Sequence, residues 1–215
     1  MTEFDETALR QGAQSLGLSL SSEQSRRLLA YGALILKWNK VYNLTALRDP
    51  ALVLTHHLLD SLAVIGPLQR ERAAAGRLLD VGSGAGLPGV VIAIMRPDLS
   101  VSCLDAVAKK AAFVQQVAAE LALPNLRGVH ERVEMFQGSF DVVSSRAFAS
   151  LADFFGGSQR LLVPGGVWLA MKGKMPADDE LALLPPGTQV FHVERLVVPG
   201  LDAERCIVWA RRIAN

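Results

Sequence analysis

The chain has 215 residues, half of them hydrophobic, and a formal net charge of +1. This length fits one domain with an appendage, and the composition can bury a sizeable core. The near-neutral charge excludes a uniformly basic protein, so a nucleic-acid partner would need a local basic patch. We expect no membrane span, because no apolar run approaches the roughly 20 residues that a span requires.

The amino-terminal residues and the two cysteines both indicate a cytoplasmic location. Residues 1–20 mix acidic and apolar side chains, unlike a secretory signal. Cys103 and Cys206 offer neither a disulfide framework nor the spacing of a metal site. We therefore expect no bound metal and interpret both cysteines as core residues.

The first 76 residues are predicted to form a helical extension that caps a cleft. Helices are expected over residues 3–16, from Ser21 to about Lys40, and over 50–65, followed by a short helix or link over 68–76. Ser21 and Gln24 form a candidate capping box at the start of the second helix. Gly66-Pro67 is expected to end the third.

From Arg77 onward strands alternate with helices, which predicts a parallel sheet with helices on its faces. Strands are expected over residues 77–81, 100–105, 126–129, 140–144 and 167–172, with helices over 88–95, 107–122 and 150–162. Residues 188–198 and 205–212 should form an antiparallel pair at the sheet edge. The predicted fold of residues 77–215 is therefore α/β, with a doubly wound, mostly parallel seven-stranded sheet.

A glycine-rich turn joins the first predicted strand to its helix. Gly84-x-Gly86-x-x-Gly89 matches the dinucleotide fingerprint, although a simple tight turn has the same bare pattern. Asp105 ends the next strand, where a carboxylate can accept hydrogen bonds from ribose hydroxyls. Nicotinamide and S-adenosylmethionine enzymes both use such an acid. The acid-x-Gly-x-Gly-x-Gly form that starts at Asp80, and the closing strand pair, favour S-adenosylmethionine.

Polar residues follow the other strands at the predicted cleft. Ser145 and Arg146 follow the fourth strand, and Lys172 and Lys174 the fifth. Arg146 could be a salt-bridge partner or a ligand contact, and the two lysines could meet phosphate or form a solvated turn. Glu134, after the third strand, could border an adenine or be a solvated loop acid.

The helical extension also carries polar residues that helix propensity does not explain. His57, Asp60 and Ser61 share one helix face. Either Asp60 caps the helix or pairs with His57, or this face walls a pocket for the methyl acceptor. Asn39 and Asn43 flank a turn, where local hydrogen bonding is the simpler interpretation.

Five motifs follow one another in order over residues 38–173. They are Trp38-Asn39-Lys40-x-x-Asn43-Leu44-Thr45, His57-x-x-Asp60-Ser61-Leu62, Asp80-Val81-Gly82-Ser83-Gly84-x-Gly86-Leu87-Pro88-Gly89, Ser145-Arg146-Ala147-Phe148-Ala149 and Lys172-Gly173. Together they resemble the ribosomal RNA small subunit methyltransferase G family, also called glucose-inhibited division protein B. The glycine motif alone is generic, whereas the co-occurrence of all five is specific.

The resemblance implies a class I, Rossmann-like enzyme that transfers a methyl group from S-adenosylmethionine to N7 of a guanine in bacterial 16S rRNA. Its partner would be 16S rRNA or the small ribosomal subunit, with no membrane partner, and we expect a cytoplasmic monomer. The cofactor contacts implied by motif position are Gly82, Ser83, Gly84, Leu87, Val133, Glu134 and Arg146. Asp105 joins them on the general fold argument.

The expected chemistry agrees with the residues present. Guanine N7 carries a lone pair and no proton, so methyl transfer needs orientation and no general base. The chain lacks the Asp/Asn-Pro-Pro-aromatic motif of amino-group methylation and the Pro-Cys of cytosine C5 methylation. Arg146, His57 and Asn39 are candidates for positioning the guanine, because arginine pairs well with its acceptor edge. The predicted RNA contacts are Lys40, Asn43, Lys172 and Lys174.

Two other functions fit the sequence. One is an S-adenosylmethionine-dependent methyltransferase of another RNA or of a small molecule. The other is a nucleotide-binding regulatory module without turnover. The motifs in the helical extension favour the rRNA enzyme, because small-molecule enzymes would have no reason to share them.

Overall fold

A computed structural model of the chain describes residues 4–72, 74, 76–146 and 148–213. Residue 3, where the first helix is expected to begin, and Ala147 lie outside the described residues. The helical segments are α1 (Glu6–Ser15), α2 (Ser22–Tyr42), α3 (Pro50–Val53), the π-helix η1 (Leu54–Leu59), α4 (Asp60–Leu62), α5 (Ile65–Glu71), α6 (Gly89–Met95), α7 (Ala108–Glu120), α8 (Leu151–Ser158), the 3₁₀-helix η2 (Gln159–Leu161) and α9 (Asp178–Ala182). The strands are β1 (Gly76–Val81), β2 (Leu99–Asp105), β3 (Leu126–His130), β4 (Phe140–Arg146), β5 (Leu162–Lys172), β6 (Thr188–Leu196) and β7 (Arg205–Arg212).

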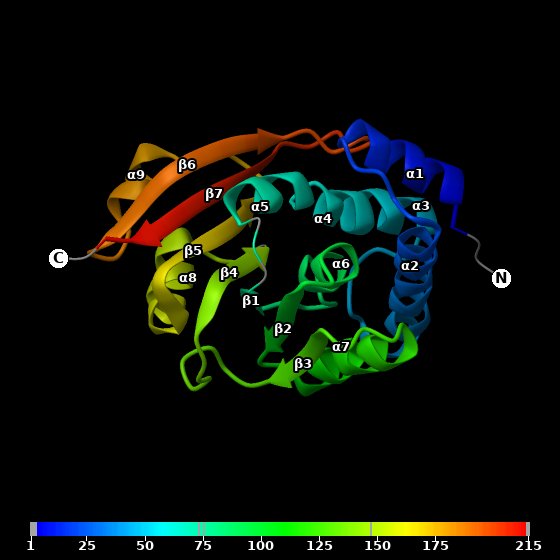
Figure 1. Cartoon of the computed structure of the whole chain (residues 1–215), viewed down its shortest axis with the longest axis horizontal. Helices are drawn as coiled ribbons and strands as arrows, with labels where there is room; N and C mark the ends of the chain where they lie inside the picture. Colours follow the sequence, from blue (N-terminus) through cyan, green and yellow to red (C-terminus); the bar gives the residue numbers. More distant parts are fainter. Residues whose placement is uncertain (1–3, 73, 75, 147, 214–215) are drawn as a thin grey trace.

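The strands form one seven-stranded sheet in the order β3-β2-β1-β4-β5-β7-β6 (Figure 1). Strands β1 to β5 pair in parallel, and β7 runs antiparallel to both of its neighbours, β5 and β6. The predicted doubly wound, mostly parallel sheet with an antiparallel pair at one edge is therefore confirmed. The carboxyl ends of β1 to β5 meet at one edge of the sheet, where ligands bind in such folds.

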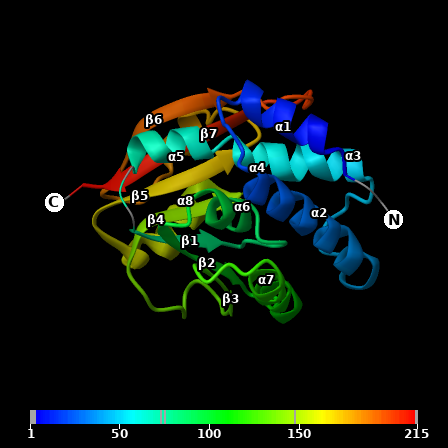
Figure 2. The ribbon, with the colours of Figure 1, turned by 45° about the vertical axis from the view of Figure 1, so that its right-hand side comes forward.

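The sheet separates two hydrophobic cores. Leu78 and Leu169 belong to one core, and the adjacent residues Leu79 and Trp168 belong to the other. Successive side chains of a strand point to opposite faces, which explains this division. The first core also contains residues of α6, α7 and the helices before β1, and Figure 2 shows α2, α4 and α6 together over that face. The second core contains residues of α8.

The helical extension is packed directly against the glycine turn. The buried Tyr31 hydroxyl of α2 donates a hydrogen bond to the Ala85 carbonyl at 2.6 Å. The predicted capping box is present, because Ser21 and Gln24 exchange side-chain and backbone hydrogen bonds of 3.0 and 3.1 Å. The division of the chain at residue 76 stays a prediction, since the extension and the sheet share the first core.

The helix that was expected to stop at Gly66-Pro67 differs in the structure. Residues 50–71 form a run of helical segments, α3, η1, α4 and α5. Pro67 lies in the first turn of α5, where its missing N–H has no intrahelical partner, so it does not end the helix. Strand β5 also begins earlier than expected and includes Pro164, with a register shift opposite Phe140 and Val142. Helix α9 has no counterpart among the predicted elements.

The segment Pro50–Glu71 bears on the expectation that the chain has no membrane span. Among the described residues it is the one helix long and apolar enough to cross a membrane, with a mean hydropathy of 1.4. However, 72% of this apolar window is buried inside the molecule. Core helices of soluble proteins pass the same test of length and composition, and the buried hydrophobic residues of this segment belong to the first core.

Candidate active site

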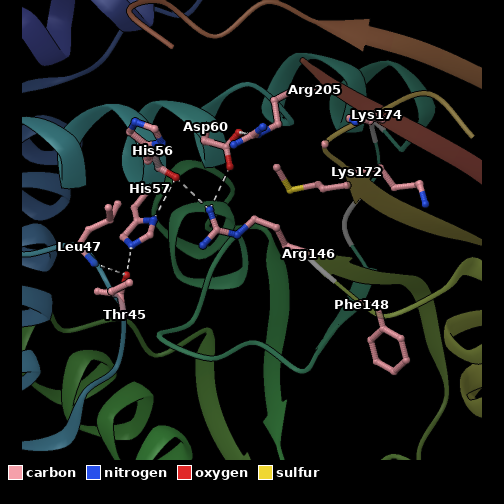
Figure 3. Close-up of a pocket in the computed structure, with 13 residues that line it drawn as sticks. Thr45, Leu47, His56, His57, Asp60, Arg146, Phe148, Lys172, Lys174 and Arg205 are labelled. Atoms are coloured by element: carbon pink, nitrogen blue, oxygen red, sulfur yellow. Dashed lines mark hydrogen bonds and ion pairs between the residues drawn. The ribbon is translucent and has the colours of Figure 1, made fainter. Parts of the chain in front are cut away.

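A cavity of about 680 Å³, here called the main cavity, opens where the helical extension meets the carboxyl ends of β4 and β5 (Figure 3). It is lined by Thr45, Ala46, Leu47, His56, His57, Asp60, Arg146, Phe148, Met171, Lys172, Gly173, Lys174 and Arg205. The cationic side chains come from three different strands or strand ends, while the extension supplies the histidines and one acid. The main cavity is therefore suited to an anionic, polar ligand.

Asp60 joins two arginines at the wall of this cavity. Its carboxylate is only 1% exposed and accepts from Arg146 Nη1 at 3.0 Å and from Arg205 Nε at 2.9 Å. Arg146 Nη1 also donates to the His56 carbonyl at 3.1 Å. A guanidinium has five N–H donors, more than these bonds use. The arrangement therefore orients two guanidinium groups that both line the main cavity (Figure 3). We refer to Asp60, Arg146 and Arg205 as the arginine clamp.

The suggested pairing of Asp60 with His57 is wrong. Asp60 pairs with the two arginines, and His57 contacts Thr45 instead. Residues 54–59 form a π-helix, whose i→i+5 pattern does not keep the side-chain alignment of an α-helix. His57 and Asp60 both line the main cavity, whereas Ser61 is fully buried and does not line it.

The hydrogen bonds around His57 assign its tautomer. Its Nδ1 lies 3.0 Å from the His56 carbonyl, which can only accept, so Nδ1 carries the proton. Nε2 then accepts from the Thr45 hydroxyl at 2.8 Å, and that hydroxyl accepts from the Leu47 N–H at 3.2 Å. Burial, together with the positive charge of Arg146, lowers the pKa of His57 to about 4. His57 is therefore neutral at pH 7 and fixes the loop that follows α2.

This low pKa predicts a specific pH dependence of stability. The unfolded chain binds a proton to His57 near pH 6.5 and the folded chain only near pH 4. The His57 contribution to the free energy of unfolding is therefore complete above pH 6.5 and is lost as the pH falls towards 4, by at most about 1.4 kcal/mol per pH unit. Urea unfolding of wild type and His57→Asn between pH 4 and 8 should give curves that differ by this slope, because the opposite contribution of Asp80, whose pKa is raised in the folded chain, is present in both proteins. The control His192→Asn, at an exposed position of β6, should keep the wild-type slope; equal slopes in His57→Asn and wild type would contradict the assignment.

Asn39 also holds this loop, through hydrogen bonds made from a buried position outside the main cavity. It is 2% exposed, its side-chain amide donates to the Leu47 carbonyl at 2.9 Å, and its carbonyl oxygen accepts from the Thr45 N–H at 3.0 Å. The local hydrogen bonding suggested for Asn39 is thus present, and Asn39 does not line the main cavity. Asn43 is exposed, with a left-handed φ of 49° at the end of α2, and Lys40 is exposed on that helix.

The glycine turn between β1 and α6 has the backbone conformation that its residues require. Gly82, Gly84 and Gly86 have φ angles of 65°, 59° and 86°, in the left-handed region that glycine tolerates best. The buried Asp80 accepts from the Gly89 N–H and from the Ser144 hydroxyl, both at 3.0 Å. Burial raises the pKa of Asp80 to about 7, against the effect of these hydrogen bonds. Asp80 thus holds the end of β1 to α6 and β4.

A second cavity, of about 190 Å³, lies beside this turn and is here called the glycine-turn cavity. It is lined by Val81, Gly82, Leu104, Asp105, Ala106, Glu131, Arg132, Val133, Glu134 and Phe148. Asp105 is 6% exposed and accepts from the N–H groups of Gly84 and Val107, each at 2.9 Å. Each carboxylate oxygen has two acceptor positions, so Asp105 can also accept from a ligand hydroxyl.

The predicted cofactor residues thus fall into three groups. Gly82, Asp105, Val133 and Glu134 line the glycine-turn cavity. Ser83, Gly84 and Leu87 build the turn itself, where Ser83 and Leu87 are buried and the Gly84 N–H orients Asp105. Arg146 lines the main cavity, where its guanidinium lies against Asp60 (Figure 3). Of the predicted RNA contacts, Lys172 and Lys174 line the main cavity, and Lys172 is paired with Glu180 at 2.6 Å.

Arg205 is a cavity residue that sequence reasoning missed. It begins β7, which runs antiparallel to β5, so the start of β7 lies beside the end of β5, with Cys206 opposite Lys172. The predicted antiparallel pair could therefore have placed Arg205 near the cavity. A residue at the start of the returning strand reaches the same edge as the carboxyl ends of the parallel strands.

The sequence model of one family, described as GidB, rRNA small subunit methyltransferase G, matches residues 24–208. The ribosomal RNA small subunit methyltransferase G of Acidovorax sp. (strain JS42) is 62% identical over 218 residues, which cover 97% of this chain and 96% of that protein. The protein of the same name from Polaromonas naphthalenivorans (strain CJ2) is 60% identical, over 97% of this chain and 96% of its own length.

Solved structures share the fold at low sequence identity. TrmN from Thermus thermophilus matches with a TM-score of 0.60 at 18% identity, over 74% of this chain and 53% of that one. An S-adenosylmethionine-dependent methyltransferase from Aquifex aeolicus matches with a TM-score of 0.59 at 16% identity, over 80% and 97%. The glycopeptide N-methyltransferase MtfA in complex with S-adenosyl-L-methionine matches with a TM-score of 0.58 at 13% identity, over 73% and 95%.

Proposed function

Because the chain belongs to the rRNA small subunit methyltransferase G family, we propose that it transfers a methyl group from S-adenosylmethionine to N7 of a guanine in bacterial 16S rRNA. The observation that carries this proposal is the pair of cavities on either side of the carboxyl end of β4. One is built on a glycine turn with an adjacent carboxylate, and the other is lined by cations.

The residues of the glycine turn fit S-adenosylmethionine. The left-handed Gly82 leaves backbone without a side chain at the cavity wall, and the Asp105 carboxylate can accept from ribose hydroxyls. Gly82, Val133 and Glu134 would hold the nucleoside part, since they line the same cavity. Helix α6 begins directly after the turn, and the positive end of its dipole suits the methionine carboxylate. When bound, the cofactor supplies an electrophilic methyl group.

The main cavity fits a guanine nucleotide. N7 must keep its lone pair free for the methyl group, so a donor from the protein should contact O6 instead. Arg146, which Asp60 holds at the cavity wall, is the candidate donor, because arginine is the side chain best suited to the acceptor edge of guanine. Neutral His57 keeps the loop at Thr45 in place and takes no proton from the substrate, because N7 has none to lose.

The cations around the main cavity fit an RNA partner. Lys172, Lys174 and Arg205 line it together with Arg146, although the whole chain carries a net charge of only +1. This local concentration of charge suits the phosphate backbone of the substrate. Lys40 and Asn43 would extend the contact along the end of α2. A cytoplasmic location and action as a monomer remain part of the proposal.

Incubation with labelled S-adenosylmethionine tests this function. The substrates are small ribosomal subunits and naked 16S rRNA from a strain without the modification. We expect label in 16S rRNA and its recovery as 7-methylguanosine after digestion to nucleosides. Label in a different nucleoside would refute the N7 assignment. Cofactor binding without any labelled product, on either substrate, would favour the regulatory module.

A further inference from the structure

One side chain lines both cavities of the site. Phe148 is the single residue common to the linings of the main cavity and the glycine-turn cavity, within the ranges that the structure describes. Its ring also lies over the glycine turn, because a Cβ atom built on Gly82 would come within 3.9 Å of two ring carbons. Phe148 therefore lies at the junction of the two cavities.

The ring of Phe148 is supported on one side and accessible on the other. Its centroid lies 5.5 Å from that of Phe154, at an interplanar angle of 43°. Phe154, a residue of α8, is 1% exposed in the second core, whereas Phe148 is 37% exposed. Arg146 is the last residue of β4 and Phe148 lies two positions beyond it, and Figure 3 shows the two side chains pointing in different directions. Phe148 thus presents an aromatic surface to the site without being needed to fill the core.

The chemistry of the acceptor explains such a surface. Enzymes that modify a base unstack it and hold it against aromatic side chains. Methylation at N7 also leaves the guanine ring with a positive charge: N7 supplies the electron pair of the new C–N bond, and the pair of the broken S–C bond stays on sulfur. An aromatic face attracts a cation, which a saturated side chain of similar size does not.

From this position we propose that Phe148 is the stacking surface for the target guanine, at the junction of the two cavities. The inference rests on the proposed function and adds the residue that contacts the face of the base. With its face on Phe148, the guanine can direct its N7 edge towards the glycine-turn cavity and O6 towards Arg146. The opposing possibility is that Phe148 is only a wall of the cofactor cavity.

Two substitutions separate these roles. Phe148→Leu keeps an apolar contact with Phe154 but removes the aromatic face, whereas Phe148→Trp keeps the face. The matched control is Phe191→Leu, on the edge strand β6, where the ring contacts Arg211 away from both cavities. Single-turnover methyl transfer to the rRNA substrate, cofactor affinity without RNA, and thermal unfolding are measured for each protein.

We expect Phe148→Leu to slow methyl transfer roughly 10- to 100-fold, the range that base–aromatic stacking supplies. Phe148→Trp and Phe191→Leu should stay within about threefold of wild type, and cofactor affinity should change less than about threefold throughout. In an RNA with 2-aminopurine at the mapped target position, binding to wild type should quench fluorescence, and binding to Phe148→Leu should quench it less.

Three results would overturn the inference. A wild-type rate in Phe148→Leu would exclude stacking on this residue. A loss of cofactor affinity as large as the loss of rate would assign Phe148 to the cofactor cavity alone. Unchanged 2-aminopurine quenching in Phe148→Leu would place the base elsewhere. Failure of the wild-type chain to label rRNA would instead refute the proposed function, and this inference with it, so the two failures are distinguishable.

Discussion

Asp60→Asn is expected to slow methyl transfer by at least about 100-fold and to lower the free energy of unfolding by about 3 kcal/mol. Asp60 is almost fully buried and is the shared partner of two arginines whose side chains are 22% and 23% exposed. An amide provides only one acceptor oxygen and no charge, so one or both guanidinium groups lose their position. Removing one member of a buried ion pair costs about 3–5 kcal/mol, and the partial exposure of the arginines favours the lower end.

The control for this substitution is Asp98→Asn. Asp98 also pairs with an arginine, Arg96, at 2.6 Å, but it lines neither cavity. This variant should lose some stability and keep its methyl-transfer rate. Adding Arg205→Gln to Asp60→Asn should cost less than the two single effects combined, because the residues share one interaction. Single-turnover rates and urea unfolding measure both quantities, and a wild-type rate in Asp60→Asn would exclude the arginine clamp from the mechanism.

Gly86→Ala should destabilise the fold by about 2–4 kcal/mol and weaken cofactor binding by roughly tenfold or more. Gly86 has a φ of +86°, and an added Cβ would lie 2.5 Å from Val90 Cγ2 and 3.1 Å from Val114 Cγ2. Both valines are fully buried, and β-branched side chains have little rotameric freedom in a helix, so the backbone of the turn must move. That movement displaces Gly82, which lines the glycine-turn cavity, and Gly84, whose N–H orients Asp105.

Gly165→Ala separates the two causes of the destabilisation expected at Gly86, which are the left-handed backbone and the close contacts of an added Cβ. Gly165 has a similar φ of +76°, but an added Cβ would meet nothing within 4 Å. Gly165→Ala should lower the free energy of unfolding by only about 1 kcal/mol, because alanine is disfavoured in the left-handed conformation. Cofactor affinity should stay unchanged. Chemical unfolding and equilibrium binding of S-adenosylmethionine give both comparisons. Equal losses in the two variants would show that backbone conformation alone, and not packing against α6 and α7, limits residue 86.

The secondary structure was largely predictable because it follows from local patterns. All seven strands were expected from apolar runs bounded by glycine, proline and polar residues, and all seven are present. The features that differ from prediction are those for which a local pattern is ambiguous or gives no indication. Pro67 was read as a helix end, although in the first turn of a helix its missing N–H has no cost. The apolar periodicity of residues 54–59 does not distinguish a π-helix from an α-helix, and the π-helix changes the expected partner of Asp60.

The fold class, the glycine turn and the family could all be predicted from the sequence, because strand and helix patterns, turn glycines and short motifs are properties of neighbouring residues. Only the tertiary structure decided the partners within the site. Asp60 lies 86 residues from Arg146 and 145 residues from Arg205, yet it contacts both. Likewise, Phe148 could be placed between two cavities only once the sheet had brought their walls together. Pairings over such distances depend on how helices and strands pack, which residue spacing along the chain does not specify.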